Sequence, residues 1–434
     1  MDRTSYKNLL KMSALYTQIG KIDKIVGMTV EATGTTCSIG DVCKIGIGDT
    51  GRQVSAEVVG FKENKALLMP YEEMDGIGYG SRVYNTQDKL TINVSDALIG
   101  RAVDAMGNPI DGGPAIEGGT PCPINGTPAN PMQRPRIDTP IEMGIRVIDG
   151  CLTVGKGQRM GIFAGSGVGK STLMGMLARN VKADVNVIAL VGERGREVVE
   201  FMNRDLGEEG KARSVLVIAT SDQPAMQRSK CALTATTIAE YFCRQGKDVL
   251  LMMDSLTRFC MAQREIGLAI GEPPVARGYT PSIYAALPKL LERAGNFEKG
   301  SITGIYTVLV EGDDTNEPIA DTVRGIIDGH IILSRKIAAK NHYPAIDLLN
   351  SVSRLMNDIA DKEQSKAAAK LRNMLAIYET NADLLSIGAY KHGSNPELDE
   401  AIAHIDKIND FLKQSVEEQV PFEATVQQLF SIMR

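Results

Sequence analysis

The sequence GQRMGIFAGSGVGKST, at residues 157–172, decides how the rest of the chain is interpreted. Its apolar part, residues 160–164, predicts a buried strand, and the periodic residues 172–180 predict a helix. The glycines between them let successive backbone N–H groups point into one concavity, and the start of the helix adds its positive dipole end. A strand, a glycine-rich turn and a helix in this order are the context of a phosphate-binding loop. The usual pattern begins with glycine where this chain has Ala164, at the strand end and outside the phosphate cradle.

The loop contains the predicted nucleotide-binding residues. Lys170 carries a charge that can reach the β- and γ-phosphates, and the hydroxyl of Ser171 can bind Mg²⁺. The full set is Gly165, Ser166, Gly167, Val168, Gly169, Lys170, Ser171 and Thr172.

Downstream of the loop, apolar runs alternate with helical patterns. These runs are residues 185–191, 215–219, 249–253, 305–310 and 331–333. The alternation predicts an α/β fold with a mainly parallel sheet and helices on both faces. Such sheets bind ligands beyond the carboxyl ends of their strands.

Two acidic residues follow strands of this predicted sheet. Asp254 ends the run 249–253, where a carboxylate beside a phosphate-binding loop holds Mg²⁺, although a strand-ending aspartate is also a common helix cap. Glu193 lies in GERGRE, residues 192–197, where a carboxylate can aim a water at the γ-phosphate. The alternating arginines and glutamates of that segment fit a salt-bridged surface loop equally well.

Outside the loop and the predicted sheet, the composition and hydrophobic pattern of the chain change several times. Residues 21–94 contain short alternating runs separated by Gly and Asp, which predict a small closed β-barrel. Residues 95–150 are rich in proline and predict an extended connector that opens an ATPase domain at residues 95–345. Residues 346–434 carry a one-face apolar stripe and predict a C-terminal helical domain. Residues 1–20 predict either a frayed tail or an amphipathic helix that docks a partner.

Composition excludes several classes of protein. Apolar residues make up 43% of the 434 residues, which excludes a mainly disordered chain. The net charge, 48 − 53 = −5, and the absence of Trp argue against nucleic acid as the main partner. No apolar run approaches the ~20 residues that span a bilayer. The 7 scattered cysteines form no zinc pattern and predict reduced thiols in a cytoplasmic protein.

Taken together, these motifs resemble the rotary-type hexameric ATPases, the family of the catalytic subunits of F-type ATP synthases. Within that family the chain most resembles the flagellar type III export ATPases. The matching segments are residues 157–172, 192–197, 253–259, 262–266, 271–274, 311–314, 318–321 and 342–347. The resemblance implies a RecA-like core between the barrel and the helical domain.

The resemblance also implies roles for single residues. It makes Lys170 the phosphate lysine, Ser171 and Asp254 the Mg²⁺ residues and Glu193 the carboxylate that activates water. It places Arg194 and Arg258 near the γ-phosphate. Arg354, after Ser351-Val352-Ser353, falls where the family has an arginine finger that reaches the neighbouring subunit's site.

Three departures from related sequences, two of them from the synthase subunit, refine the expectation. Leu309 stands where that subunit has a tyrosine, which leaves the adenine pocket without an expected aromatic ring. Residues 296–300 look short beside flagellar relatives. Residues 388–400 replace a dense acidic helix–loop and favour a secretion enzyme. The sequence FAGSG at residues 163–167 favours the flagellar branch over the injectisome branch.

The resulting expectation is a Mg²⁺-dependent ATP hydrolase that energises export of flagellar proteins. The resemblance implies a homo-oligomer, a hexamer, that is cytoplasmic and peripheral at the inner membrane. Its implied partners are export regulator or stalk proteins, chaperone–substrate complexes and the membrane export gate, with no nucleic acid. The alternatives are an injectisome ATPase or another rotary-type catalytic subunit, a hexameric RNA translocase, and a non-catalytic subunit, which would lack the carboxylate of Glu193.

Overall fold

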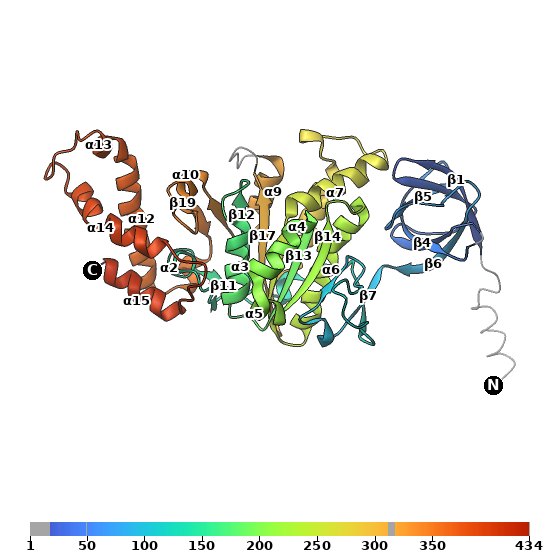
Figure 1. Cartoon of the computed structure of the whole chain (residues 1–434), viewed down its shortest axis with the longest axis horizontal. Helices are drawn as coiled ribbons and strands as arrows, with labels where there is room; N and C mark the ends of the chain where they lie inside the picture. The colour runs from blue at the N-terminus through green and yellow to red at the C-terminus, as the bar shows by residue number, and fades with distance from the viewer. Residues whose placement is uncertain (1–17, 49, 311–316, 434) are drawn as a thin grey trace.

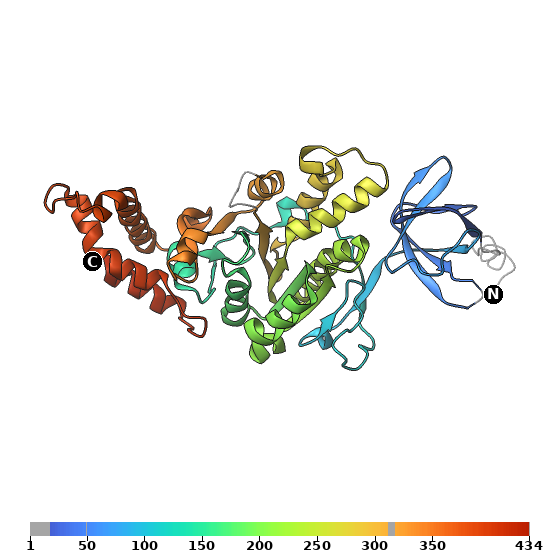
Figure 2. The same cartoon turned by 45° about the horizontal axis from the view of Figure 1, so that its top comes forward.

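The computed structural model describes residues 18–48, 50–310 and 317–433. A barrel lies at one end of the long axis, a helical bundle at the other, and a sheet with its helices between them (Figures 1 and 2). The predicted fold class is confirmed. The predicted N-terminal helix lies, up to residue 17, outside the described residues, and Ile19 already begins strand β1.

The barrel closes from six strands in the order β1-β2-β5-β4-β3-β6, and each neighbouring pair is antiparallel. Alternate residues such as Ile22, Val30, Ile45, Val58 and Val83 fill its interior, as the period of two in these strands requires. The strands are β1 (Ile19–Val26), β2 (Thr29–Thr33), β3 (Asp41–Gly46), β4 (Gln53–Lys62), β5 (Lys65–Pro70) and β6 (Arg82–Lys89).

The connector contains more structure than its proline content predicts. Its strand β9 pairs with β7 (Thr91–Val94), which the sequence analysis placed in the barrel but which lies outside the closed barrel, and β8 joins the edge of the central sheet beside β14. The elements of residues 95–150 are η1 (Asp96–Leu98), β8 (Ala102–Val103), β9 (Thr120–Pro123), η2 (Pro131–Gln133), β10 (Pro140–Ile141) and the start of α2 (Arg146–Cys151), and β11 (Val154–Gly155) follows.

The central sheet has nine strands, with the order β19-β18-β12-β17-β15-β13-β14-β8 and with β16 paired to β17. The pairs are parallel except β18 with β19 and β16 with β17. Its further strands are β12 (Arg159–Ala164), β13 (Val185–Glu193), β14 (Ser214–Thr220), β15 (Asp248–Asp254), β16 (Gly295–Asn296), β17 (Ser301–Leu309), β18 (Gly329–Leu333) and β19 (Ile346–Ser353).

Strand β19 extends the sheet past the expected domain boundary at residue 345. The sequence analysis assigned this segment to the helical domain. It is an antiparallel edge strand, so only alternate residues are buried and the parallel-strand signature is absent.

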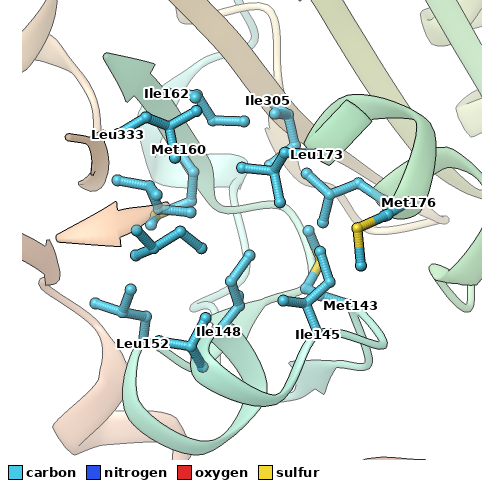
Figure 3. Close-up of a cluster of buried hydrophobic side chains, with 14 of the residues drawn as sticks. Met143, Ile145, Ile148, Leu152, Met160, Ile162, Leu173, Met176, Ile305 and Leu333 are labelled. Atoms are coloured by element: carbon cyan, nitrogen blue, oxygen red, sulfur yellow. The ribbon is translucent and has the colours of Figure 1, made fainter. Parts of the chain in front are cut away.

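Helices cover both faces of the sheet. On one face, Leu173 and Met176 of α3 pack against Met160 and Ile162 of β12 (Figure 3). Helices α6, α7, α8 and α9 pack on the other face. The flanking helices are α3 (Lys170–Asn180), α4 (Gly195–Glu200), the π-helical η3 (Phe201–Leu206), α5 (Gly207–Ala212), α6 (Ala225–Arg244), α7 (Leu256–Ala269), η4 (Ala276–Gly278), α8 (Pro281–Leu291), α9 (Pro318–Ile326) and α10 (Arg335–Ala339).

The C-terminal helices share the core of the first face. Leu371, Ile408, Phe411 and Leu429 belong to the same buried cluster as α2 and α3. These helices are α11 (Met356–Ile359), α12 (Lys362–Thr380), α13 (Ala382–Ser386), α14 (Pro396–Leu412) and α15 (Phe422–Met433). Within the described residues, no helix has the length and apolar character needed to cross a membrane.

Candidate active site

The phosphate-binding loop lies between β12 and α3, as its sequence predicts. Gly167 and Gly169 have φ values of 79° and 90°, in the left-handed region that favours glycine. Gly169 is the N-cap of α3, and Lys170 and Ser171 form the first turn of that helix. The loop borders a cavity of about 440 Å³. The loop residues that line it are Gly165, Ser166, Gly167, Gly169, Lys170, Ser171 and Thr172.

Two neighbouring strands bring their carboxylates to the same cavity. Asp254 ends β15 and Glu193 ends β13, which pair in parallel, so both side chains emerge at the edge that carries the loop. The Nζ of Lys170 lies 2.5 Å from Oδ1 of Asp254 and 3.8 Å from Oε1 of Glu193. Thr307 of β17 donates a hydrogen bond of 2.7 Å to the same Oδ1. The structure therefore places the two predicted acids around the predicted lysine.

Burial and neighbouring charges shift the pKa values of Glu193 and Lys170. Burial, and then the nearby charge of Asp254, raise the pKa of Glu193 to about 7. Burial alone lowers the pKa of Lys170, but the carboxylates of Asp254 and Glu193 outweigh it and the net shift is upward. Lys170 therefore faces two carboxylates, and the pKa of the second, Glu193, lies near neutral pH.

The residues present fit a bound Mg²⁺. Oε1 of Glu193 is buried and has no hydrogen-bond partner among the described residues. The Asp254 carboxylate and the Ser171 side chain also line the cavity, and both can supply oxygen ligands. No cluster of three or more His, Cys, Asp or Glu that could hold a metal occurs in the described part of the chain. Mg²⁺ is usually held by one or two carboxylates together with substrate phosphates and water, so a larger cluster is not required.

The predicted arginines lie in different places. Arg258 lines the cavity, its Nε is buried without a partner, and its charge lowers the pKa of Glu193. Arg194 lies at the rim with a side chain that is 76% exposed. Arg204, which the sequence analysis did not single out, also lines the cavity.

Arg354 lies at the opposite end of the sheet strands. The residue before it, Ser353, pairs with Gly329 of β18, and Gly329 pairs with Met160 at the beginning of β12. The phosphate-binding loop follows the other end of β12. Arg354 is exposed and is not among the residues that line its own subunit's cavity.

The sequence analysis did not identify one aromatic residue that lies beside the loop. The ring of Tyr343 lies 3.6 Å from the point where a Cβ on Gly169 would be, and 42% of Tyr343 is exposed. Leu309, where the resemblance led us to look for a tyrosine, lines the cavity. The Tyr343-Pro344 pair was the available signal, but its distance from the loop along the chain gave no reason to place it there.

Three segments of the chain match known families. Residues 144–353 match the ATP synthase alpha/beta family, nucleotide-binding domain, and residues 22–87 match the β-barrel domain of the same family. Residues 360–431 match the C-terminal domain of the type III secretion ATPase EscN.

Similar proteins span the whole chain. The "Flagellum-specific ATP synthase" of Bacillus subtilis is 53% identical over 433 residues, which are 100% of this chain and 99% of that protein. The "Type 3 secretion system ATPase" of Xanthomonas euvesicatoria is 50% identical, over 99% of this chain and 97% of that protein. The solved structure of the assembled ATPase EscN from enteropathogenic E. coli matches with a TM-score of 0.91 and 46% identity, over 96% of this chain and 100% of that one.

Proposed function

The chain belongs to the ATP synthase alpha/beta family, among its flagellum-specific and type 3 secretion ATPases, and on that premise we propose how its residues hydrolyse ATP. The observation that carries the proposal is the convergence of Lys170, Asp254 and Glu193 on one cavity beside the loop.

We assign nucleotide binding to the loop and the start of α3. The backbone N–H groups of the loop and the helix dipole hold the phosphates, and Lys170 adds its charge at the β- and γ-phosphates. ATP displaces the contact between Lys170 and Asp254, because the lysine cannot serve both partners at full strength. The exposed ring of Tyr343 provides an apolar face beside the loop for the base.

Glu193 acts on the attacking water. Its carboxylate accepts a hydrogen bond from the water and then its proton, while the water oxygen bonds to the γ-phosphorus and the bond to the β–γ bridging oxygen breaks. Ser171 and Asp254 would hold Mg²⁺, which when bound neutralises charge on the β- and γ-phosphates. Arg258 and Arg194 are proposed to meet the γ-phosphate from the cavity wall and its rim.

Arg354 is proposed as the arginine finger of a neighbouring subunit's site. Its place at the amino end of β12, away from its own cavity, supports a role across a subunit boundary. The relative EscN has been solved in an assembled form and in complex with its central stalk EscO. We therefore propose a homohexameric ring with a stalk protein as partner.

The cellular role follows the relatives. We propose export of flagellar proteins, with the injectisome branch as the alternative, because a flagellum-specific relative has 53% identity and a type 3 secretion relative has 50%. The proposal includes a cytoplasmic enzyme, peripheral at the inner membrane, that meets an export regulator, chaperone–substrate complexes and the export gate. Removal of residues 1–17, which ends before strand β1, tests the regulator contact: wild-type partner binding and export in the truncated protein would reject it.

The chemical assignment is tested with Glu193→Ala. The variant is expected to bind a fluorescent ATP analogue normally and to lose hydrolysis, because the carboxylate acts on water and not on the nucleotide. Arg196→Ala is the matched control, since Arg196 belongs to the same segment but forms only an exposed ion pair with Glu200. Near-normal turnover of Glu193→Ala would reject the assignment.

The finger is tested by mixing inactive variants. Arg354→Ala is expected to bind ATP normally and to lose about 10³–10⁵-fold in turnover. Mixed rings of Arg354→Ala and Glu193→Ala contain interfaces with an intact Glu193 and a neighbour's intact Arg354, so part of the activity returns. Mixing Lys170→Ala with Glu193→Ala, which damage the same cavity, is the control that restores nothing.

A further inference from the structure

The amino end of β12 is held by a buried hydrogen-bonded glutamine. Gln158 is fully buried, and its Oε1 accepts a bond of 2.8 Å from the N–H of Gly155. Its Nε2 donates to Oγ of Ser353 at 3.1 Å and to the carbonyl of Asp328 at 3.3 Å. Ser353 immediately precedes Arg354.

The Asp328 turn completes this arrangement. Nε and Nη2 of Arg159 donate to the Asp328 carboxylate at 3.0 and 3.1 Å, and the backbone N–H of Asp328 donates to the carbonyl of Arg159 at 2.9 Å. The carbonyl of Asp328 also accepts the backbone N–H of Arg354 at 3.0 Å. The carbonyl of Asp328 thus accepts hydrogen bonds from both the Gln158 side chain and the Arg354 backbone.

This arrangement joins two functional positions through one strand. β12 carries the phosphate-binding loop at its carboxyl end and the anchor of Arg354 at its amino end. The backbone of Arg354 is fixed while its side chain is exposed, with Nη2 bonded to the carbonyl of Arg324 at 3.0 Å. A long side chain on a fixed backbone can still extend to a neighbouring site, and it loses less conformational entropy on binding because its backbone is already ordered.

We propose that Gln158 is a positioning residue for Arg354, and that it therefore serves the active site of the neighbouring subunit and not the site of its own. The inference rests on the proposed role of Arg354 as a finger.

The test begins with Gln158→Leu, which shortens the side chain by one heavy atom and replaces both polar ends with methyl groups. Turnover is expected to fall about 10–100-fold, the cost of a catalytic group misplaced by roughly 1 Å, while KM for ATP stays within about twofold. Ser353→Ala removes only the hydroxyl that Gln158 contacts and is expected to give a smaller loss in the same direction. It keeps the proposal testable if Gln158→Leu does not fold.

The matched control is Thr303→Val. Oγ1 of Thr303 accepts a buried hydrogen bond of 2.9 Å from the N–H of Gly157, on the side of β12 that faces β17 and away from the finger. The substitution disturbs the same end of the strand without touching Ser353 or Asp328. Turnover in this control is expected to stay within about twofold of wild type if only the finger side matters.

Mixing experiments identify which site each variant damages, with native mass spectrometry to verify that mixed rings form. Gln158→Leu, or Ser353→Ala if needed, is expected to regain activity with Glu193→Ala and none with Arg354→Ala. The reverse pattern, rescue by Arg354→Ala, would show that the glutamine supports its own subunit's cavity and would overturn the inference while leaving the finger intact. Wild-type turnover in both variants would also overturn it. If Arg354→Ala and Glu193→Ala do not complement each other, the finger assignment fails and this inference fails with it.

Discussion

Two lysines in the described part of the chain face carboxylates in different ways: Lys230 is buried and Lys170 is partly buried. Lys230 of α6 contacts Glu57 of the barrel strand β4 at 2.7 and 2.8 Å, and Tyr71 donates a third bond of 2.6 Å to the same carboxylate. Lys170 contacts Asp254 at 2.5 Å and lies 3.8 Å from Glu193, whose Oε1 has no hydrogen-bond partner among the described residues. Both oxygens of Glu57 are therefore hydrogen-bonded within the chain, whereas the cavity around Lys170 keeps an unused acceptor on Glu193.

The difference lies in what completes each group. A buried ion pair whose hydrogen bonds are all made within the chain fixes two elements against each other, here the barrel against α6. Polar groups left without partners in a cavity can bind something that arrives there, and a cation with bound phosphates would supply partners for both the acids and the cations around Lys170. The comparison predicts that damage at Lys230 appears as lost stability and damage at Lys170 as lost catalysis.

The largest expected effect is that of Lys170→Ala on turnover. Loss of this charge from the phosphate cradle is expected to cost at least about 10³-fold in kcat/KM, with weaker ATP binding as well. The melting temperature is expected to fall less than in the barrel-junction variant below, because Glu193, whose pKa is raised to about 7, can take up a proton once the ammonium is gone. Steady-state hydrolysis and calorimetry on the same preparation give both values. A large loss of stability with retained turnover would contradict the comparison.

The matching change in the barrel junction is Lys230→Met. It leaves Glu57 buried and unpaired, which is expected to cost about 3–5 kcal/mol of unfolding free energy, with wild-type kcat/KM in the folded protein. Adding Glu57→Gln to Lys230→Met is expected to recover a large part of the loss, because the stranded charge is gone. Urea unfolding measures both variants. If the double variant is no more stable than Lys230→Met, the stranded charge is not the cause.

The raised pKa of Glu193 predicts a pH dependence. Because the pKa of Glu193 is raised to about 7, the carboxylate that accepts a proton from water is lost as pH falls through 7. We expect kcat/KM to fall about tenfold per pH unit below this value. The same raised pKa makes the folded state bind more protons than the unfolded chain between pH 4.5 and about 7, so this group costs stability as pH rises through that window.

Glu193→Gln checks the sign of that stability effect. The variant is expected to melt at a higher temperature than wild type at pH 8, where the wild-type carboxylate is charged, and at nearly the same temperature at pH 5. An unchanged melting temperature at pH 8 would show that Glu193 is not held against its charge.

The smallest expected effect is that of Tyr71→Phe. The substitution removes one hydrogen bond to Glu57 and keeps the ring in place, so about 1–3 kcal/mol of stability is expected to be lost with no change in ATP hydrolysis. Urea unfolding measures it against Lys230→Met. A loss as large as that of Lys230→Met would show that the hydroxyl, and not the lysine, holds the junction.

These two lysines also show what could and what could not be predicted from the sequence. Lys170 could be predicted because the loop residues are consecutive, and Asp254 and Glu193 because each follows an apolar run at one edge of a parallel sheet. Nothing marked Lys230 or Glu57, which lie 173 residues apart and meet only through the packing of two domains.

Other features were hidden for the same reason. Strand β19 lacks an apolar run because it lies at an antiparallel edge, and its place beside β18 is what brings Arg354 to the Asp328 turn. Tyr343 reaches the loop only through the tertiary fold. The proposed roles of Glu193, Asp254 and the arginines remain predictions that the variants above test.

The closure of the N-terminal barrel has a consequence for assembly. In a ring of six subunits, six sheets of this kind would be crowded together for the lifetime of the complex. Because β6 pairs with β1, the six described barrel strands form a closed ring. Closure removes sheet edges, the rows of unpaired backbone groups on which a neighbour's strand could form. In the proposed hexamer, neighbouring barrels would therefore meet through side chains and not through strand pairing between subunits.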